Sequence, residues 1–99
     1  MKNDKQAILN TLTANQARIK SFGVRSLALF GSTARGEATE KSDLDFIVEF
    51  ERKSFDAYMD LKLFLEHLFG TRVDLASADR IKPRLRDKIL EDAVHAPGL

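Results

Sequence analysis

The chain has 99 residues, a formal net charge of +1 from sixteen basic and fifteen acidic residues, and no cysteine. We expect one domain spanning residues 1–99, without disulfides or thiolate metal sites, and the charge balance gives no bulk argument for a nucleic-acid or membrane partner. The opening MKNDKQAILN lacks the apolar core of a secretory signal, and no apolar run approaches the roughly 18–20 residues that span a bilayer, so a cytoplasmic protein is expected.

The first half of the chain predicts one helix and two strands. Segment 5–22 is expected to be a helix that ends at Gly23, because its apolar residues share one helical stripe. These residues are Ile8, Leu9, Leu12, Ile19 and Phe22. Residues 26–30 (SLALF) predict a short buried strand, and a polar stretch follows it. Residues 43–50 (DLDFIVEF) alternate as a half-buried strand does. One face carries Leu44, Phe46, Val48 and Phe50, and the other carries Asp43, Asp45, Ile47 and Glu49.

The second half predicts a helix, a strand and a last helix. Ser54 is the expected N-cap of a helix that runs to Phe69 and stops at Gly70. Residues 72–76 (RVDLA) predict a third strand, Pro83 begins the last helix, and the HAPGL tail is expected to be frayed. A helical crossover between the second and third strands favours a parallel pair. The prediction is a mixed α/β fold with a three-stranded sheet packed with helices.

Two aspartates, Asp43 and Asp45, begin the second predicted strand two residues apart. This spacing aims both carboxylates to one side of the sheet, where at about 4 Å and an effective dielectric near 20 they would repel by roughly 4 kcal/mol. A cation would offset that repulsion, and Mg²⁺ is often held by one or two carboxylates together with substrate phosphates. The pair alone is also typical of exposed aspartates at a strand start.

The turn before these aspartates has the features of a phosphate-binding loop. Gly31 directly follows the first predicted strand, and a glycine there lets backbone N–H groups approach an anion closely. Ser32 adds a hydroxyl donor. Arg35 and Arg18 are candidates for the remaining phosphate charge, with Arg35 the better placed. No Walker lysine motif occurs, and taken singly the Gly-Ser pair is an ordinary turn.

Taken together, the run GSTARGEATEKSDLDFIV resembles the signature of the polymerase-β-like nucleotidyltransferase superfamily. In that family a strand ends in Gly-Ser, and Asp-x-Asp follows ten residues later on the next strand. The resemblance implies that Gly31, Ser32 and Arg35 bind nucleotide phosphates and that Asp43 and Asp45 bind metal. It also implies a third metal-binding and catalytic carboxylate on a later strand. Asp74 fits this role, since the flanking Val73 and Leu75 face the other way.

Glu49 is the competing third acid, because it lies on the same strand face as Asp45. It stands about 13 Å further along that strand at 3.3 Å per residue, which favours Asp74. The chemistry implied by the resemblance is in-line attack of an acceptor hydroxyl on the α-phosphate of ATP, with pyrophosphate leaving. Two Mg²⁺ ions, or Mn²⁺, would stabilise the attacking and leaving oxygens.

The whole chain resembles the stand-alone minimal nucleotidyltransferases of prokaryotes, which lack an acceptor-binding domain. That group is typically paired with a helical toxin of the HEPN class. The resemblance therefore implies an antitoxin that transfers AMP to a tyrosine hydroxyl of its partner. The alternative is a non-catalytic antitoxin that neutralises its partner by complex formation, and transfer to a small molecule or to RNA is a third hypothesis.

The remaining features predict packing or contacts rather than chemistry. The helix 55–69 is apolar on more than one face, which suggests an interface with another subunit. His67 and His95 have no second ligand at a metal-binding spacing and are expected to be structural or exposed. A basic cluster surrounds the last helix and is expected to be a solvated face, with nucleic acid or an acidic partner as the less favoured interpretation. Its members are Arg80, Lys82, Arg84, Arg86 and Lys88.

Overall fold

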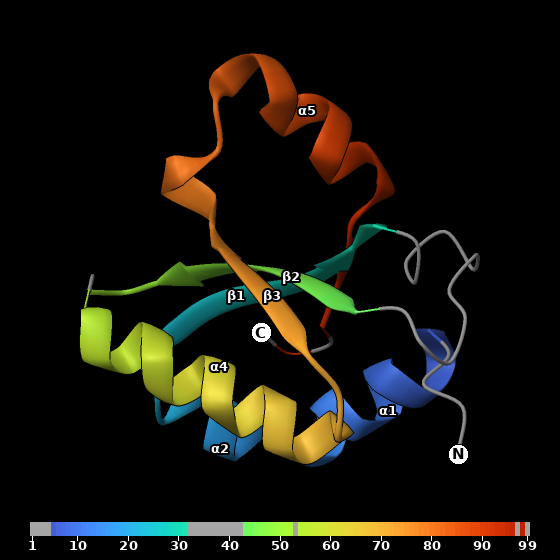
Figure 1. Cartoon of the computed structure of the whole chain (residues 1–99), viewed down its shortest axis with the longest axis vertical. Coiled ribbons are helices and arrows are strands. Elements are labelled where there is room, and N and C mark those ends of the chain that lie inside the picture. The colour runs from blue at the N-terminus through green and yellow to red at the C-terminus, as the bar shows by residue number, and fades with distance from the viewer. Residues whose placement is uncertain (1–4, 32–42, 53, 97, 99) are drawn as a thin grey trace.

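A mixed sheet in the order β3-β2-β1-β4 forms the centre of the molecule (Figure 1). The computed structural model describes residues 5–31, 43–52, 54–96 and 98. The strands in this part of the chain are β1 (Val24–Phe30), β2 (Leu44–Phe50), β3 (Val73–Ser77) and β4 (Val94–His95). The helices are α1 (Lys5–Ala14), α2 (Gln16–Lys20), α4 (Phe55–Phe69), α5 (Pro83–Asp92) and a short 3-10 turn, η1 (Ala78–Arg80).

Helices α1, α2 and α4 cover one face of the sheet, whereas α5 stands on the other side (Figure 1). The core lies between the sheet and the first three helices. Its largest fully buried side chains are Phe46, Ile8, Leu12, Ile19, Leu27, Leu29, Leu44, Leu61, Leu65, Val48 and Val73. No helix in the described ranges is long and apolar enough to cross a membrane.

The parallel pairing of β2 with β3 confirms the prediction made from the helical crossover. Helix α4 makes that crossover, with the predicted boundaries. The Ser54 hydroxyl accepts a hydrogen bond from the Ala57 N–H at 3.2 Å, and Gly70 ends the helix in the left-handed conformation at φ 64°. Both caps satisfy backbone groups that a helix end otherwise leaves without a partner.

The expected single helix over 5–22 is wrong, because the chain forms two helices that meet at Asn15. The Asn15 side-chain amide donates to the Thr11 carbonyl at 2.9 Å. Asparagine competes in this way for backbone groups and therefore disfavours a helix interior. The change of direction still brings Ile19 of α2 into the same core as Ile8 and Leu12 of α1.

The expected frayed tail and three-stranded sheet are also corrected. Val94–His95 forms a fourth strand that pairs antiparallel with β1. The Ala96 N–H donates to the Leu27 carbonyl at 2.8 Å, and Ala96 is only 2% exposed. The tail thereby covers the edge of β1, whose backbone groups would otherwise be open to unwanted pairing.

The core depends most clearly on Phe46, which is fully buried on β2 and stacks against Phe69 with ring centroids 6.0 Å apart. We expect Phe46→Ala to lower the free energy of unfolding by about 3–5 kcal/mol, because it loses burial and leaves a cavity. Urea denaturation followed by circular dichroism measures this. Phe55→Ala is the matched control, since Phe55 is 76% exposed and should change stability by less than about 0.5 kcal/mol. Equal effects would show that the core is not centred on Phe46.

Candidate active site

The acidic residues of the sequence motif gather at one end of the central sheet. Asp45 on β2 and Asp74 on β3 are direct register partners in the parallel pair. Neighbouring strands lie about 4.8 Å apart, and register partners project to the same face. Asp43 precedes β2 by one residue and shares the face of Asp45 because the side chain between them, Leu44, is buried in the core.

Gly31 brings the end of β1 against the same carboxylate. Phe30, the last residue of β1, is the register partner of Asp45. Gly31 follows with φ 77°, and a Cβ added to it would lie 2.5 Å from the Asp45 Oδ2. A side chain at this position would therefore meet both an unfavourable backbone conformation and the carboxylate itself. Three strands thus place Gly31, Asp45 and Asp74 next to one another.

Two of the predicted site residues, Ser32 and Arg35, lie outside the described residues. Asp43 and Asp74 are exposed, and Asp45 is half-buried. Among the described residues, no group of three or more histidine, cysteine, aspartate or glutamate side chains converges closely enough to hold a metal ion. The described carboxylates supply hard oxygen donors of the kind that Mg²⁺ binds in company with phosphate oxygens.

The structure separates Glu49 from the other acids. Its carboxylate accepts a hydrogen bond from the Arg25 guanidinium at 3.2 Å, in an ion pair between β2 and β1. It lies four residues beyond Asp45 toward the opposite end of β2. The register of β3 therefore places Asp74, and not Glu49, beside Asp45.

Arg18 does not lie with these acids either. It belongs to α2 on the helical side of the sheet, with its guanidinium 5.7 Å from the Phe22 ring centroid and 5.9 Å from that of Phe64. His67 and His95 are exposed. The sequence predicted that they would be either structural or exposed, and the second alternative holds.

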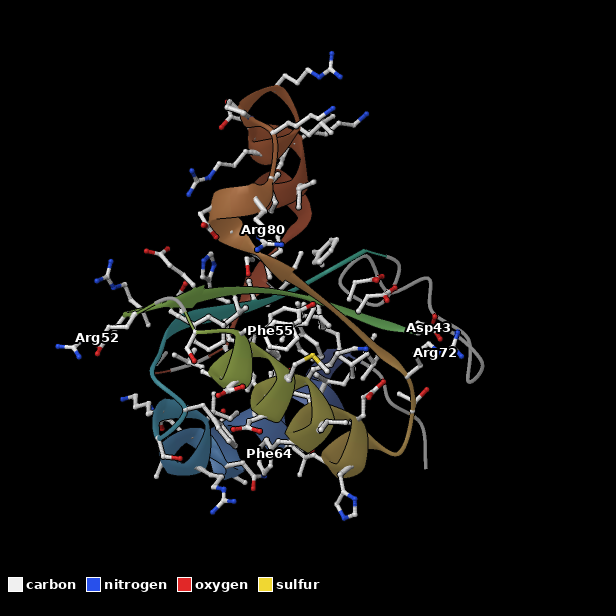
Figure 2. The ribbon with its side chains drawn as sticks, turned by 60° about the vertical axis from the view of Figure 1, so that its left-hand side comes forward. Asp43, Arg52, Phe55, Phe64, Arg72 and Arg80 are labelled. Atoms are coloured by element: carbon white, nitrogen blue, oxygen red, sulfur yellow. The ribbon has the colours of Figure 1, made fainter. Side chains whose placement is uncertain are left out.

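One residue at the acidic end of the sheet was missed by sequence reasoning. Arg72 directly precedes β3, and its carbonyl accepts a hydrogen bond from the Leu44 N–H at 3.1 Å. Figure 2 shows the Arg72 and Asp43 side chains together at this end of the sheet. The signal was present in the sequence, since strand alternation across Arg72-Val73-Asp74 puts the arginine and the aspartate on one face.

A cleft of about 720 Å³ lies at the other end of β2 and β3. It opens between the first turn of α4 and η1, and its walls include Phe55, Tyr58, Arg80 and Arg86. Figure 2 labels two of these residues, Phe55 at the start of α4 and Arg80 in η1. The acids begin these strands whereas the cleft adjoins their last residues, so the two features are separate.

The nucleotidyltransferase domain family matches residues 11–95 of the chain. Protein adenylyltransferase MntA of Thermococcus cleftensis is 38% identical over 91% of this chain and 93% of its own length. A solved structure described provisionally as a minimal nucleotidyltransferase is 43% identical, with a TM-score of 0.72 over 87% of this chain and 93% of that one.

The fold is also found in a toxin–antitoxin complex. A chain in the structure of a tri-AMPylated Shewanella oneidensis HEPN toxin with its MNT antitoxin superposes with a TM-score of 0.58. It is 18% identical, and the match covers 88% of this chain and 72% of that one. At this identity the likeness concerns the fold alone. The family match and the two closer similarities show that the chain belongs to the nucleotidyltransferase domain family.

Proposed function

We propose that this nucleotidyltransferase is a Mg²⁺-dependent protein adenylyltransferase that transfers AMP from ATP to a tyrosine hydroxyl of a HEPN-type toxin, and so acts as an antitoxin. The observation that carries the proposal is the pairing of Asp45 with Asp74 beside the Gly31 turn. The name of the Thermococcus cleftensis relative supports the protein acceptor. The absence of cysteine suits a reducing compartment, and we assign the protein to the cytoplasm.

The proposed reaction is an in-line displacement at the α-phosphorus of ATP. The acceptor oxygen forms a new bond to the α-phosphorus, the bond from that phosphorus to the α–β bridging oxygen breaks, and pyrophosphate leaves. Asp74 accepts the hydroxyl proton, or would help to hold the metal near the acceptor. Gly31 and Ser32, with Arg35, hold the β- and γ-phosphates. Most of the rate enhancement then comes from positioning and charge stabilisation.

The carboxylates Asp43, Asp45 and Asp74 are the proposed metal ligands. They offer only oxygen, which suits Mg²⁺ and also Mn²⁺. Triphosphate oxygens would complete the coordination, because Mg²⁺ is usually bound by one or two carboxylates together with substrate phosphates. When bound, the metal supplies charge stabilisation for the attacking and leaving oxygens.

The edge strand β3 and helix α4 form the proposed docking side for the partner. The edge itself is blocked: the Val73 N–H donates to the Glu66 carboxylate at 3.1 Å, and the Tyr58 hydroxyl donates to the Leu75 carbonyl at 2.5 Å. A partner therefore cannot easily extend the sheet by adding a strand, since side chains of α4 already occupy outward-facing backbone groups of β3.

An apolar stripe on α4 runs beside this blocked edge. Phe55, Met59 and Leu63 recur every four residues and therefore lie on one side of the helix. Phe55 is 76% exposed and Leu63 is 59% exposed. Glu66 lies next to this stripe on the helix and reaches β3, whereas Phe64 faces the turn after α2 through a ring contact with Phe22 at 5.4 Å. The stripe supports the expected interface through helix 55–69.

A second candidate, a binding antitoxin without catalysis, rests on the same α4 stripe. Such a protein would need the docking surface but not the three carboxylates. The two functions therefore predict different results for a variant that lacks one carboxylate. An adenylyltransferase would no longer neutralise its partner, whereas a binding antitoxin would still do so.

Asp45→Asn should reduce transfer of label from α-³²P-ATP to the acceptor by at least about a hundredfold, since it removes a carboxylate that would hold the metal at the reacting phosphate. The transfer is measured in lysate of the source organism with Mg²⁺, and EDTA should abolish it. Glu49→Gln is the matched control, because it removes a carboxylate from the same face of β2 in the pair with Arg25. Label from γ-³²P-ATP would contradict nucleotidyl transfer, and an Asp45→Asn protein that still neutralised its partner would favour the binding antitoxin.

Gly31→Ala should lower transfer by at least about tenfold, because the new methyl group displaces the Asp45 carboxylate. Gly23→Ala is its control: Gly23 also has a positive φ, 86°, but a Cβ there meets nothing within 4 Å. Both variants should lose about 1–2 kcal/mol of stability from backbone strain, measured by urea denaturation. Only Gly31→Ala should lose transfer. Equal transfer by the two variants would show that Gly31 is not part of the site.

The double variant Phe55→Ser/Leu63→Ser should weaken binding of the labelled acceptor by at least about tenfold, because interface anchors are exposed aromatic and aliphatic side chains. Affinity is measured by co-elution with the purified acceptor. Leu85→Ser on α5 is the control, as Leu85 is 46% exposed on a different helix. Loss of binding by the control alone would place the docking surface on α5.

A further inference from the structure

A cation lies on the same face of the sheet as the three carboxylates. Val73 is fully buried in the core, so its neighbours in sequence, Arg72 and Asp74, project to the opposite face. Leu44 pairs with Val73, and extending this register by one residue places Arg72 opposite Asp43. The 3.1 Å hydrogen bond from the Leu44 N–H to the Arg72 carbonyl holds the two backbones together at that point.

The guanidinium of Arg72 is available to a ligand. Arg72 is exposed, and within the described ranges its side chain has no hydrogen-bond or ion-pair partner. In Figure 2 it lies beside the Asp43 side chain at the acidic end of the sheet. The described residues around it otherwise present acids, which by themselves repel an anionic phosphate. An arginine in this position can offset part of that repulsion and also bind oxygens through two parallel N–H donors.

The positions of Gly31 and Arg72 on either side of Asp45 define a direction across the site. Gly31 follows β1, on one side of β2, and Arg72 precedes β3, on the other. In the proposed reaction the leaving phosphates lie on the Gly31 side. We propose that Arg72 binds the non-bridging oxygens of the α-phosphate, the group that is transferred. This inference rests on the proposed function and deepens it, because it assigns an α-phosphate contact to the residue that directly precedes β3.

The α-phosphate is also the group whose negative charge an arginine can stabilise during transfer, because in phosphoryl-type transfers charge is spread over the equatorial oxygens. Arg72 therefore contributes both to nucleotide affinity and to the transfer step. A lysine would keep the charge but lose the paired donors, so Arg72→Lys should restore only part of the effect.

Binding of Mg²⁺–α,β-methylene-ATP, which cannot release pyrophosphate at the α–β position, tests this inference without turnover. Calorimetry should show that Arg72→Ala weakens binding by about tenfold and that Arg72→Lys recovers part of the loss. Arg80→Ala is the matched control, since Arg80 is an exposed arginine just beyond the opposite end of β3. It should bind the analogue as the unaltered protein does. Urea denaturation of each variant checks that the fold is retained, and Arg72→Gln replaces Arg72→Ala if the smaller side chain unfolds the protein.

The outcomes separate this inference from the proposed function. If the unaltered protein fails to bind the analogue, the proposed function fails. If the unaltered protein binds and Arg72→Ala binds equally well, the α-phosphate assignment is wrong. If analogue binding is unchanged but the KM for the acceptor protein rises, Arg72 contacts the acceptor instead, which also overturns the inference.

Discussion

The register of β2 against β3 is the constraint on which both the core and the candidate site depend. Leu44 and Val73 pair within the core, and the next pair in the register, Asp45 and Asp74, projects from the other face. A slip of one residue would bury a carboxylate and expose an apolar side chain. Burying an unpaired carboxylate is far more costly than any surface contact could offset. The same alternation that fills the core therefore positions the acids.

Helix α4 holds that register from outside the sheet. Its caps fix where the crossover begins and ends, and its Tyr58 and Glu66 side chains bond to the backbone of β3. These bonds orient the edge strand and also block it. The C-terminal pairing through Ala96 covers part of the opposite edge, along Leu27 to Leu29 of β1. Two of the large apolar side chains that stay exposed, Phe55 and Leu63, lie on the α4 stripe.

Much of this arrangement could be predicted from the sequence because it follows from local patterns. The alternation around Asp45, the caps of α4 and the strand face on which Asp74 lies each depend on a few neighbouring residues. The break at Asn15 and the pairing of Val94–His95 could not be predicted in the same way. The break at Asn15 involves one local side-chain bond that the apolar stripe does not reveal, and the pairing of Val94–His95 depends on contacts with the distant strand β1.

Within the described residues, the candidate site presents mainly negative charge. Asp43 and Asp74 are exposed, so water screens their repulsion, and folding does not require a bound cation there. In the proposed function, a metal-bound triphosphate would contribute both the counter-charge and ligand oxygens. Since Asp74 and the proposed docking side share β3, a partner seated on the α4 stripe would lie near the strand that carries the proposed base. Recognition and chemistry can therefore be joined without moving any element of the fold.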